Sequence, residues 1–125
     1  MTLENRIMDT LEYHFDDRCA TIVMSRALLD ELGAKVEDLE GIVSIPRRIE
    51  GVDVAVAFRE NPSGTYKISV RTGEKANASA ICENFGGGGH VKAAGCTMTG
   101  EPQEIVEKIS GKIKEQWDEN AAFHG

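Results

Sequence analysis

Four consecutive glycines, Gly86–Gly89, stand directly before a titratable residue, His90. Because glycine has no side chain, successive backbone N–H groups can converge on an anion, and the backbone can approach a ligand closely. A protonated imidazole beside them could donate a charge-assisted hydrogen bond to phosphate oxygens. The segment therefore predicts a phosphate-binding loop, particularly if a short helix starts at His90 and directs its N-terminus at the same anion.

The glycine run also has structural explanations. A flexible linker joins separate units, whereas this run lies between two apolar segments that belong to one predicted core. Neither familiar glycine motif fits, because the run lacks the Gly-Lys-Ser/Thr ending of a nucleoside triphosphate loop and follows a predicted helix, where a dinucleotide fingerprint follows a strand. His90 could instead be satisfied by local backbone groups, and the residues alone leave that alternative open.

The sequence offers few other basic residues that could bind the same phosphate. The sequence has 14 basic and 21 acidic residues and a formal charge of -7, which opposes a broad, sequence-independent grip on a nucleic acid backbone. The candidates for a local positive spot are Arg71, Lys92 and the pair Arg47 and Arg48. For Arg47 and Arg48 the simpler interpretation is solvated surface charge.

The three cysteines, Cys19, Cys82 and Cys96, are odd in number and widely spaced among apolar residues. This pattern favours reduced, buried thiols over disulfides or a metal site. The N-terminus is charged and amphipathic, unlike a secretory signal, and no apolar run is long enough to span a membrane. We therefore expect a cytoplasmic protein.

The elements that must position these residues can be predicted from the spacing of apolar side chains. With 125 residues, 41% of them hydrophobic, the chain can bury one core and should form a single domain. Residues 3–15 have the spacing of an amphipathic helix, 19–25 form an apolar run typical of a buried strand, and 26–33 indicate a helix closed by Gly33. The next segment is ambiguous, because Pro46 restricts the residue before it.

A β-hairpin is predicted for residues 52–58 and 65–71, which both alternate apolar and other side chains around the turn sequence Asn-Pro-Ser-Gly. Opposed residues share a face of a sheet. The apolar sets therefore meet if Phe58 faces Ile68 and Val56 faces Val70, or at an even shift of that pairing.

Arg71 then lies on the opposite face of the hairpin. The residues around it there, Asp53, Ala55 and Ala57, are small and leave room. This face should either be covered by a helix or form the floor of a groove.

After the hairpin, residues 77–85 have helical spacing, with Asn77 as a cap and the glycine run as the stop. Residues 95–99 read as a short strand, and the last segment, which begins at Pro102, reads as a surface helix with one apolar stripe. The predicted fold class is α+β: a mixed β-sheet of about four or five strands with helices packed on it.

Three segments in this order and spacing, "VSIPRRIEGVDVAVAFRE", "KISVRT" and "FGGGGHVKAAG", resemble the C-terminal DHH-associated domain of the DHH phosphoesterases. The similarity is greatest to one branch of this family, which contains three kinds of protein. These are oligoribonucleases that also act as phosphatases on 3′,5′-bisphosphorylated adenosine, cyclic dinucleotide phosphodiesterases, and exopolyphosphatase-related proteins. It extends from the strand "ATIVMS" to the last helix. The ordered pair of arginine strand and GGGGH loop is specific, whereas a lone glycine run would not be.

The resemblance implies roles for individual residues. Gly86–Gly89 and His90 match the nucleotide- and phosphate-binding motif of the family, and Arg71 matches the arginine of its "SxRS" strand, which contacts substrate phosphate. Thr72 stands where serine is usual and keeps a hydroxyl. The implied substrate phosphate-binding set is Arg71, Gly86, Gly87, Gly88, Gly89 and His90.

The resemblance also exposes a departure. In the family, an N-terminal domain with an Asp-His-His signature holds two Mn²⁺ ions that activate water. Here the nearest substitute is "HFDD", His14–Asp17, which lacks paired histidines, and the three histidines are too scattered for a metal cluster. We therefore expect no catalytic or metal-binding residue in this chain, and we expect Mn²⁺ only in a missing catalytic domain.

The chain is accordingly interpreted as the substrate-binding part, residues 18–125, of a phosphoesterase, preceded by an N-terminal helix, residues 1–17, near the linker to that missing domain. Alone it should be inactive. The residues do not choose among a short RNA, bisphosphorylated adenosine, a cyclic dinucleotide and polyphosphate as substrate. Two other functions stay open: a stand-alone module that binds nucleotides or single-stranded nucleic acid, and a structural or dimerisation domain whose glycine loop lets helices pack closely.

Overall fold

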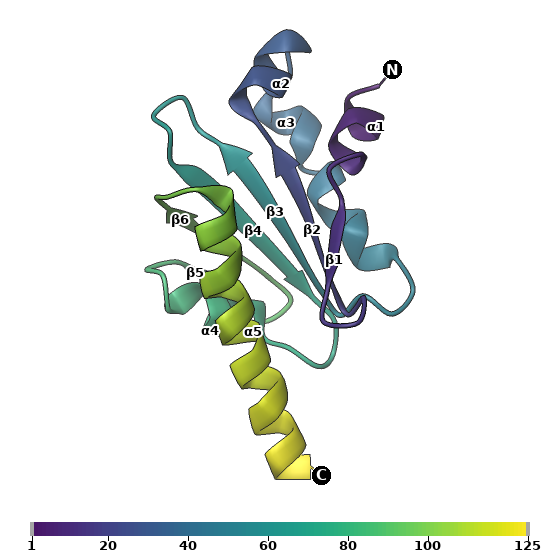
Figure 1. The fold of residues 1–125 in the computed structure, drawn as a ribbon, viewed down its shortest axis with the longest axis vertical. Coiled ribbons are helices and arrows are strands. Elements are labelled where there is room, and N and C mark those ends of the chain that lie inside the picture. The colour runs from purple at the N-terminus through teal and green to yellow at the C-terminus, as the bar shows by residue number, and fades with distance from the viewer. Residues whose placement is uncertain (1, 125) are drawn as a thin grey trace.

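The computed structural model describes residues 2–124, which form one open six-stranded sheet with helices on both faces (Figure 1). The strand order is β1-β2-β3-β4-β6-β5. The strands are β1 (Glu12–His14), β2 (Cys19–Met24), β3 (Val54–Glu60), β4 (Tyr66–Thr72), β5 (Gly88–His90) and β6 (Ala93–Met98). The α+β class is confirmed, and the sheet has slightly more strands than predicted because its two edges are short strands of three residues.

Helices fill the connections between these strands. The α-helices are α1 (Leu3–Met8), α2 (Arg26–Glu31), α3 (Val36–Leu39), α4 (Ala78–Glu83) and α5 (Pro102–His124). Two 3₁₀-helices, η1 (Ile42–Ser44) and η2 (Pro46–Arg48), form the segment that the sequence left ambiguous. β2 and β3 are parallel and the other neighbours are antiparallel, so the sheet is mixed and the segment from α2 to η2 is the crossover.

One face of the sheet packs against α4 and α5, and Figure 1 shows α5 crossing it. Its core combines the even-numbered residues of β3, β4 and β6 with an apolar stripe of α5: Val54, Val56, Phe58, Ile68, Val70, Cys96, Ile105, Ile109, Ile113 and Trp117. Phe58 lies opposite Ile68 and Val56 opposite Val70. The predicted hairpin register is therefore confirmed.

The other face is only partly covered. Ile22 and Met24 of β2 and Ala57 of β3 form a second core with residues of α1, α2, α3 and η1. Beyond β3 this layer ends, and the odd-numbered residues of β4, Lys67, Ser69 and Arg71, are half-buried and line cavities. From the sequence, we expected this face to be either covered by a helix or the floor of a groove. It is covered over β2 and β3, and it is hollowed over β4 and β6.

The N-terminal helix predicted for residues 3–15, and assigned to the segment 1–17, is wrong after Met8. Residues Glu12–His14 instead form the edge strand β1, paired with β2. The hydroxyl of Thr10 donates to the carbonyl of Ile7 at 2.7 Å and accepts from the backbone N–H of Val23 at 2.8 Å, so the chain leaves the helix and joins the sheet there.

Phe15 explains why the apolar spacing was misleading. Phe15 packs against the core of the α5 face, whereas Ile7 is buried under the opposite face, and one short helix cannot reach both. The ring of Phe15 meets that of Trp117 edge-on, with centroids 5.3 Å apart, and the guanidinium of Arg18 lies 3.8 Å over the same ring. A turn at Phe15, Asp16 and Asp17, all with positive φ, makes this possible.

A second correction concerns His90. No helix starts there: Gly88–His90 form β5, the edge strand beside β6. The other local predictions around the loop are confirmed, because the side chain of Asn77 accepts a hydrogen bond from the N–H of Ala80 at 3.0 Å and caps α4, and Gly86, with a φ of 81°, follows that helix.

The cysteines are buried and unpaired, as predicted. Among the described residues, no helix is both long and apolar enough to cross a membrane.

Candidate functional site

The predicted phosphate-binding residues lie on neighbouring strands. Arg71 of β4 is paired with Ala93 of β6, and Ala93 is paired with His90 of β5. Directly opposed residues share a face, so Arg71 and His90 lie on the same face at either side of a small residue. Two strand spacings separate their backbones by about 10 Å. We call this set, Arg71, Ala93 and His90, the arginine–histidine row.

The next row of the sheet provides a floor without bulk. It consists of Ser69 of β4, Gly95 of β6 and Gly88 of β5. These residues line an open cavity of about 270 Å³ together with Arg71. A ligand there would meet backbone and a hydroxyl below, with a guanidinium at the side.

The four glycines of the run have different surroundings. Gly86 has a left-handed φ of 81°, and a Cβ added to Gly87 would collide with the carbonyl oxygen of Gly95. A Cβ on Gly89 would lie 2.8 Å from the carbonyl oxygen of Ala93. Turn geometry and close packing against β6 therefore account for these three glycines.

Gly88 is the exception. No heavy atom lies within 4 Å of an added Cβ, and Gly88 is absent from the glycines with positive φ. Neither backbone conformation nor packing within residues 2–124 requires a glycine there. The space above Gly88 is therefore open.

Arg71 and His90 have few protein partners. Nη1 of Arg71 donates to the carbonyl of the adjacent Val70 at 3.2 Å, and Arg71 forms no ion pair with any described residue. His90 is exposed, and its ring makes no hydrogen bond with the described side chains or backbone. Its position is therefore not explained by local backbone hydrogen bonds.

Two cations of this face were missed by sequence reasoning. Lys67 lies on the Arg71 side of β4, and its Nζ is 2.6 Å from the Cβ position of Gly95, so the ammonium group lies directly over that glycine. Arg59 of β3 is paired with Lys67. The alternation that placed Arg71 on this face also applies to Lys67, and the predicted register would have added Arg59.

A larger cavity of about 550 Å³ adjoins this floor and shares Lys67, Ser69 and Arg71 with it. Arg59 and Glu40 also line it. Its apolar wall comes from the crossover and β2: Met24, Val36, Leu39 and Val43. The groove thus has a cationic, small-residue floor and an apolar side.

The remaining candidate cations serve other purposes. Nη1 of Arg47 donates to the carbonyl of Val52 at 3.0 Å, and its Nε is buried with no partner among the described residues. Lys92 forms an ion pair with Glu74 at 2.6 Å, and this hydrogen bond holds the pKa of the Glu74 carboxyl below its usual value. Surface charge alone is thus a fair description of Lys92 but not of Arg47.

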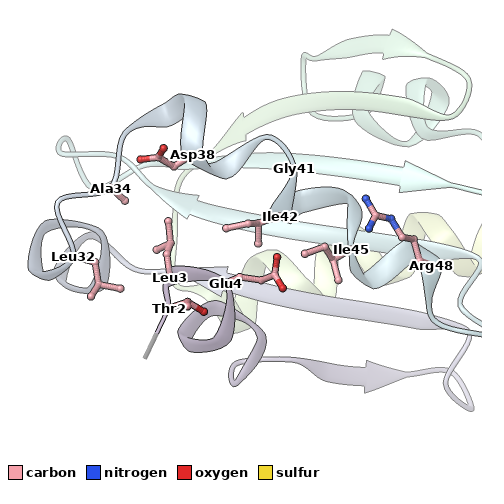
Figure 2. A pocket seen from close by; sticks show the side chains of 10 residues that line it. All are labelled: Thr2, Leu3, Glu4, Leu32, Ala34, Asp38, Gly41, Ile42, Ile45 and Arg48. Carbon is pink, nitrogen blue, oxygen red and sulfur yellow. The ribbon is translucent and has the colours of Figure 1, made fainter.

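Arg48 lies at one end of another cavity, of about 620 Å³, between α1 and the segment from the end of α2 to η2 (Figure 2). Leu3, Leu32, Ile42 and Ile45 supply apolar side chains there. None of the predicted phosphate-binding residues lines this cavity.

The described side chains, those of residues 2–119, contain no group of three His, Cys, Asp or Glu residues that could hold a metal ion. Nε2 of His14 is 3.1 Å from the hydroxyl of Thr21, on β1 and β2. Asp16 and Asp17 are exposed in the turn that follows. The residues present do not fit a two-metal centre.

Two thiols lie behind the glycine loop. Cys82 of α4 and Cys96 of β6 are both buried, and the N–H of Gly87 donates to the carbonyl of Cys82 at 3.0 Å. A hydrogen bond with the Cys96 side chain, together with burial, raises the pKa of the Cys82 thiol well above its usual range. Cys82 is therefore a packing residue that supports the loop in neutral form.

Comparison with known proteins gives a match to the family model described as "DHHA1 domain" over residues 19–117. The bifunctional oligoribonuclease and PAP phosphatase NrnA of Thermus thermophilus is 30% identical over 115 residues, which are 91% of this chain and 34% of that protein. A probable bifunctional oligoribonuclease and PAP phosphatase NrnA of Streptococcus mutans is 26% identical over 97 residues, which are 76% of this chain and 31% of that protein. The chain thus spans about a third of the length of these relatives.

Solved structures give the same picture of the fold. An exopolyphosphatase-related protein from Bacteroides fragilis is 25% identical with a TM-score of 0.84, over 93% of this chain and 34% of that chain. The pGpG-specific phosphodiesterase PggH from Vibrio is 14% identical with a TM-score of 0.60, over 90% of this chain and 37% of that chain, and supports the fold alone.

Proposed function

The chain belongs to the DHHA1 domain family, and on this premise we propose that it is the substrate-binding part of a DHH phosphoesterase that acts on short oligonucleotides or small phosphorylated nucleotides. In this proposal a substrate phosphate lies over Ala93, between Arg71 and the segment Gly86–His90. The names of the Thermus and Streptococcus relatives, which are oligoribonucleases and phosphatases, support this substrate class.

The observation that carries the proposal is the arginine–histidine row. Two side chains that can donate to an anion lie on one face, from separate strands, and neither forms an ion pair with a described side chain. A guanidinium can bind phosphate oxygens through two parallel hydrogen bonds, and an imidazolium can add a third from the other side. Gly88, whose Cβ position is open, would let the ligand approach the backbone.

Binding and orientation are the tasks that we assign to this chain. Its residues do not fit a metal centre, so we assign hydrolysis to a separate DHH domain, with the Mn²⁺ ions expected there. The formal charge of -7 agrees with such a division, because a site for one or two phosphates needs few cations, whereas a long nucleic acid track would need many.

The test is an NMR titration of the ¹⁵N-labelled chain with adenosine 5′-monophosphate. We expect amide shifts centred on Gly86–His90 and on the neighbours of Arg71, and we expect Arg71→Ala to weaken binding about tenfold through loss of a charge-assisted hydrogen bond. Lys108→Ala is the control, because it removes an exposed cation from α5, on the other face of the sheet.

Two results would contradict the proposal. One is a set of shifts centred on the cavity beside α1 and not on the glycine loop. The other is unchanged affinity in both Arg71→Ala and His90→Ala while their spectra remain those of the folded protein. The glycines would then have to be explained by packing alone.

A further inference from the structure

Two cysteines pack against each other behind the glycine run. Cys82 lies on α4 and Cys96 on β6, both are buried in the same core, and a side-chain hydrogen bond joins their thiols. The function proposed above uses neither of them. Two thiols in contact are the arrangement from which a disulfide can form with a small movement.

Gly87 lies between this pair and the proposed phosphate site. Its N–H donates to the carbonyl of Cys82 at 3.0 Å, and the position of a Cβ on Gly87 is 2.6 Å from the Cβ of Cys96. Gly88, which follows it, is paired with Gly95 of β6. A change in the separation of the two cysteines must therefore displace the glycine run.

The two thiols differ in how readily they lose a proton. The hydrogen bond from Cys82 lowers the pKa of the Cys96 thiol; burial opposes this effect, and the positive charge of Lys67 adds to it. The same hydrogen bond, together with burial, raises the pKa of the Cys82 thiol. Because the thiolate is the reactive form, Cys96 is the sulfur that attacks an oxidant, and Cys82 is the neighbouring thiol that can complete a disulfide.

We propose that Cys82 and Cys96 are a redox-sensitive pair: a hydroperoxide oxidises them to a disulfide, and the disulfide displaces the glycine run and weakens phosphate binding, an effect that rests on the function proposed above. The Cys96 thiolate attacks an oxygen of the peroxide, the O–O bond breaks, and a sulfenic acid forms. The Cys82 sulfur then attacks the Cys96 sulfur, so that the S–S bond forms and the S–O bond breaks.

Atoms and electrons balance in this reaction. With hydrogen peroxide, two thiols and one peroxide give one disulfide and two waters. Each leaving oxygen departs as water after taking up a proton that one of the thiols releases. The thiols lose two electrons, and the peroxide gains them. A dithiol reductant reverses the change by thiol–disulfide exchange.

Forming this bond must move α4. The sulfurs of a disulfide are about 2.05 Å apart, which is closer than two unbonded sulfur atoms can lie. β6 is paired with a strand on each side, whereas α4 is a helix of six residues that continues into the glycine run. The helix is therefore the element that shifts. The carbonyl of Cys82 moves with it, and we expect the hydrogen bond from Gly87 to carry this movement to the segment Gly86–His90.

The oxidant reaches these thiols only after a local opening, because Cys82 is 0% and Cys96 5% exposed. The elements around the glycine run are short: α4 has six residues and β5 has three. Such short segments can open at a lower free-energy cost than the whole domain. A phosphate ligand held by the glycine run would oppose this opening, so bound nucleotide should slow the oxidation.

The first experiment follows the disulfide itself and needs no ligand. The reduced chain is treated with hydrogen peroxide, its remaining thiols are alkylated in denaturant, and its peptides are mapped by mass spectrometry. We expect a disulfide between Cys82 and Cys96, with Cys19 alkylated, because burial raises the pKa of the Cys19 thiol to about 12. A bond that involves Cys19 would overturn the inference, as would the absence of any disulfide under conditions that oxidise free cysteine.

The second experiment measures the consequence for binding by NMR titration with adenosine 5′-monophosphate. We expect the oxidised protein to bind about fivefold more weakly than the reduced protein, with amide shifts changed at Gly86–His90, and we expect dithiothreitol to restore both. Cys82→Ala cannot form the bond, so its affinity should be the same before and after peroxide; Cys96→Ala serves in its place if Cys82→Ala does not fold. Cys19→Ala is the matched control and should respond to peroxide as the parent does.

The outcomes separate this inference from the function on which it rests. If the reduced protein binds the nucleotide at the glycine run and the disulfide leaves that affinity unchanged, the inference is wrong and the proposed function stands. If peroxide weakens binding equally in Cys82→Ala, another oxidised residue is responsible and the inference is again wrong. If the reduced protein binds with no shifts at Gly86–His90, the proposed function is wrong, while peptide mapping still decides whether the two cysteines are a redox pair.

Discussion

At the scale of single residues, Gly88 is the one glycine of its run that neither a left-handed φ nor close packing explains. Gly87 and Gly89 pack so closely against β6 that any Cβ would meet its backbone, and Gly86 has a left-handed φ. Counting glycines in a sequence cannot separate these roles, because a turn, a close strand contact and a ligand site all select glycine. The structure separates these roles, because it shows which atoms a Cβ at each glycine would contact.

Substitution by alanine should divide these roles. Gly87→Ala should destabilise the fold by about 1–3 kcal/mol, because the new methyl overpacks against β6. Gly88→Ala should leave the melting temperature nearly unchanged and weaken binding of adenosine 5′-monophosphate several-fold, since its methyl would occupy the groove. Thermal unfolding and NMR titration of both variants check this. A Gly88→Ala protein that binds as well as the parent would mean that no ligand approaches this point.

His90 should contribute to the proposed binding as a hydrogen-bond donor. We expect His90→Ala to weaken binding of adenosine 5′-monophosphate about threefold to tenfold, because the variant loses a ring N–H at the side of the row opposite Arg71. NMR titration of the two proteins under the same conditions measures the ratio of their dissociation constants. Equal dissociation constants for two folded proteins would show that His90 takes no part in binding.

The candidate site was predictable from sequence only in part. Alternation in the hairpin placed Arg71 on the face with small residues, and the resemblance pointed to the glycine run. Arg59 and Lys67 lay within reach of the same alternation but were not singled out, because isolated basic residues on a strand usually read as solvated charge. What sequence could not supply is the pairing of β6 with both β4 and β5, which brings Arg71 and His90 into one row.

At the scale of elements, strand pairing between distant residues determined the secondary structure at the places where local sequence patterns predicted it wrongly. The helix expected over residues 3–15 ends at Met8, and the segment at His90 is a strand, because both sequences lie beside a sheet edge that offers unpaired backbone groups. The hairpin and α5 were predicted well, since strict alternation over seven residues and a stripe over several turns each have one reading. A short segment of mixed apolar spacing can be interpreted either as a helix or as a strand.

Thr10 should control the switch from α1 to β1. Its hydroxyl accepts a hydrogen bond from the N–H of Val23, near the end of β2, and donates one to the carbonyl of Ile7 in α1. Thr10→Val keeps the shape but leaves that donor without its acceptor, so we expect a loss of about 1–3 kcal/mol in the free energy of unfolding. Thr10→Ser keeps the hydroxyl and should cost clearly less. Equal stability of the two variants in urea unfolding would show that the hydroxyl does not hold this junction.

At the scale of the whole molecule, the groove is an open surface. Its floor comes from β4, β5 and β6, its apolar side comes from the crossover between β2 and β3, and the described residues supply no metal ligands opposite. A ligand phosphate would remain partly solvated, and hydrogen bonds in water contribute less than the same bonds in an enclosed site. The curated relatives are about three times as long as this chain, and we propose that further parts of such proteins close the groove.

The last prediction follows from this open geometry and concerns the 125-residue chain by itself. We expect it to bind adenosine 5′-monophosphate with a dissociation constant of about 0.1 to 1 mM, and to hydrolyse no phosphodiester when Mn²⁺ is added, because its described residues form part of a cleft and no group that could hold a metal ion. Calorimetry and a nuclease assay with 5′-phosphorylated diadenylate measure the two quantities, with a relative of full length as the positive control for hydrolysis. Micromolar binding would favour a stand-alone binding module, and turnover by rigorously purified protein that stops on chelation would place catalysis in this chain after all.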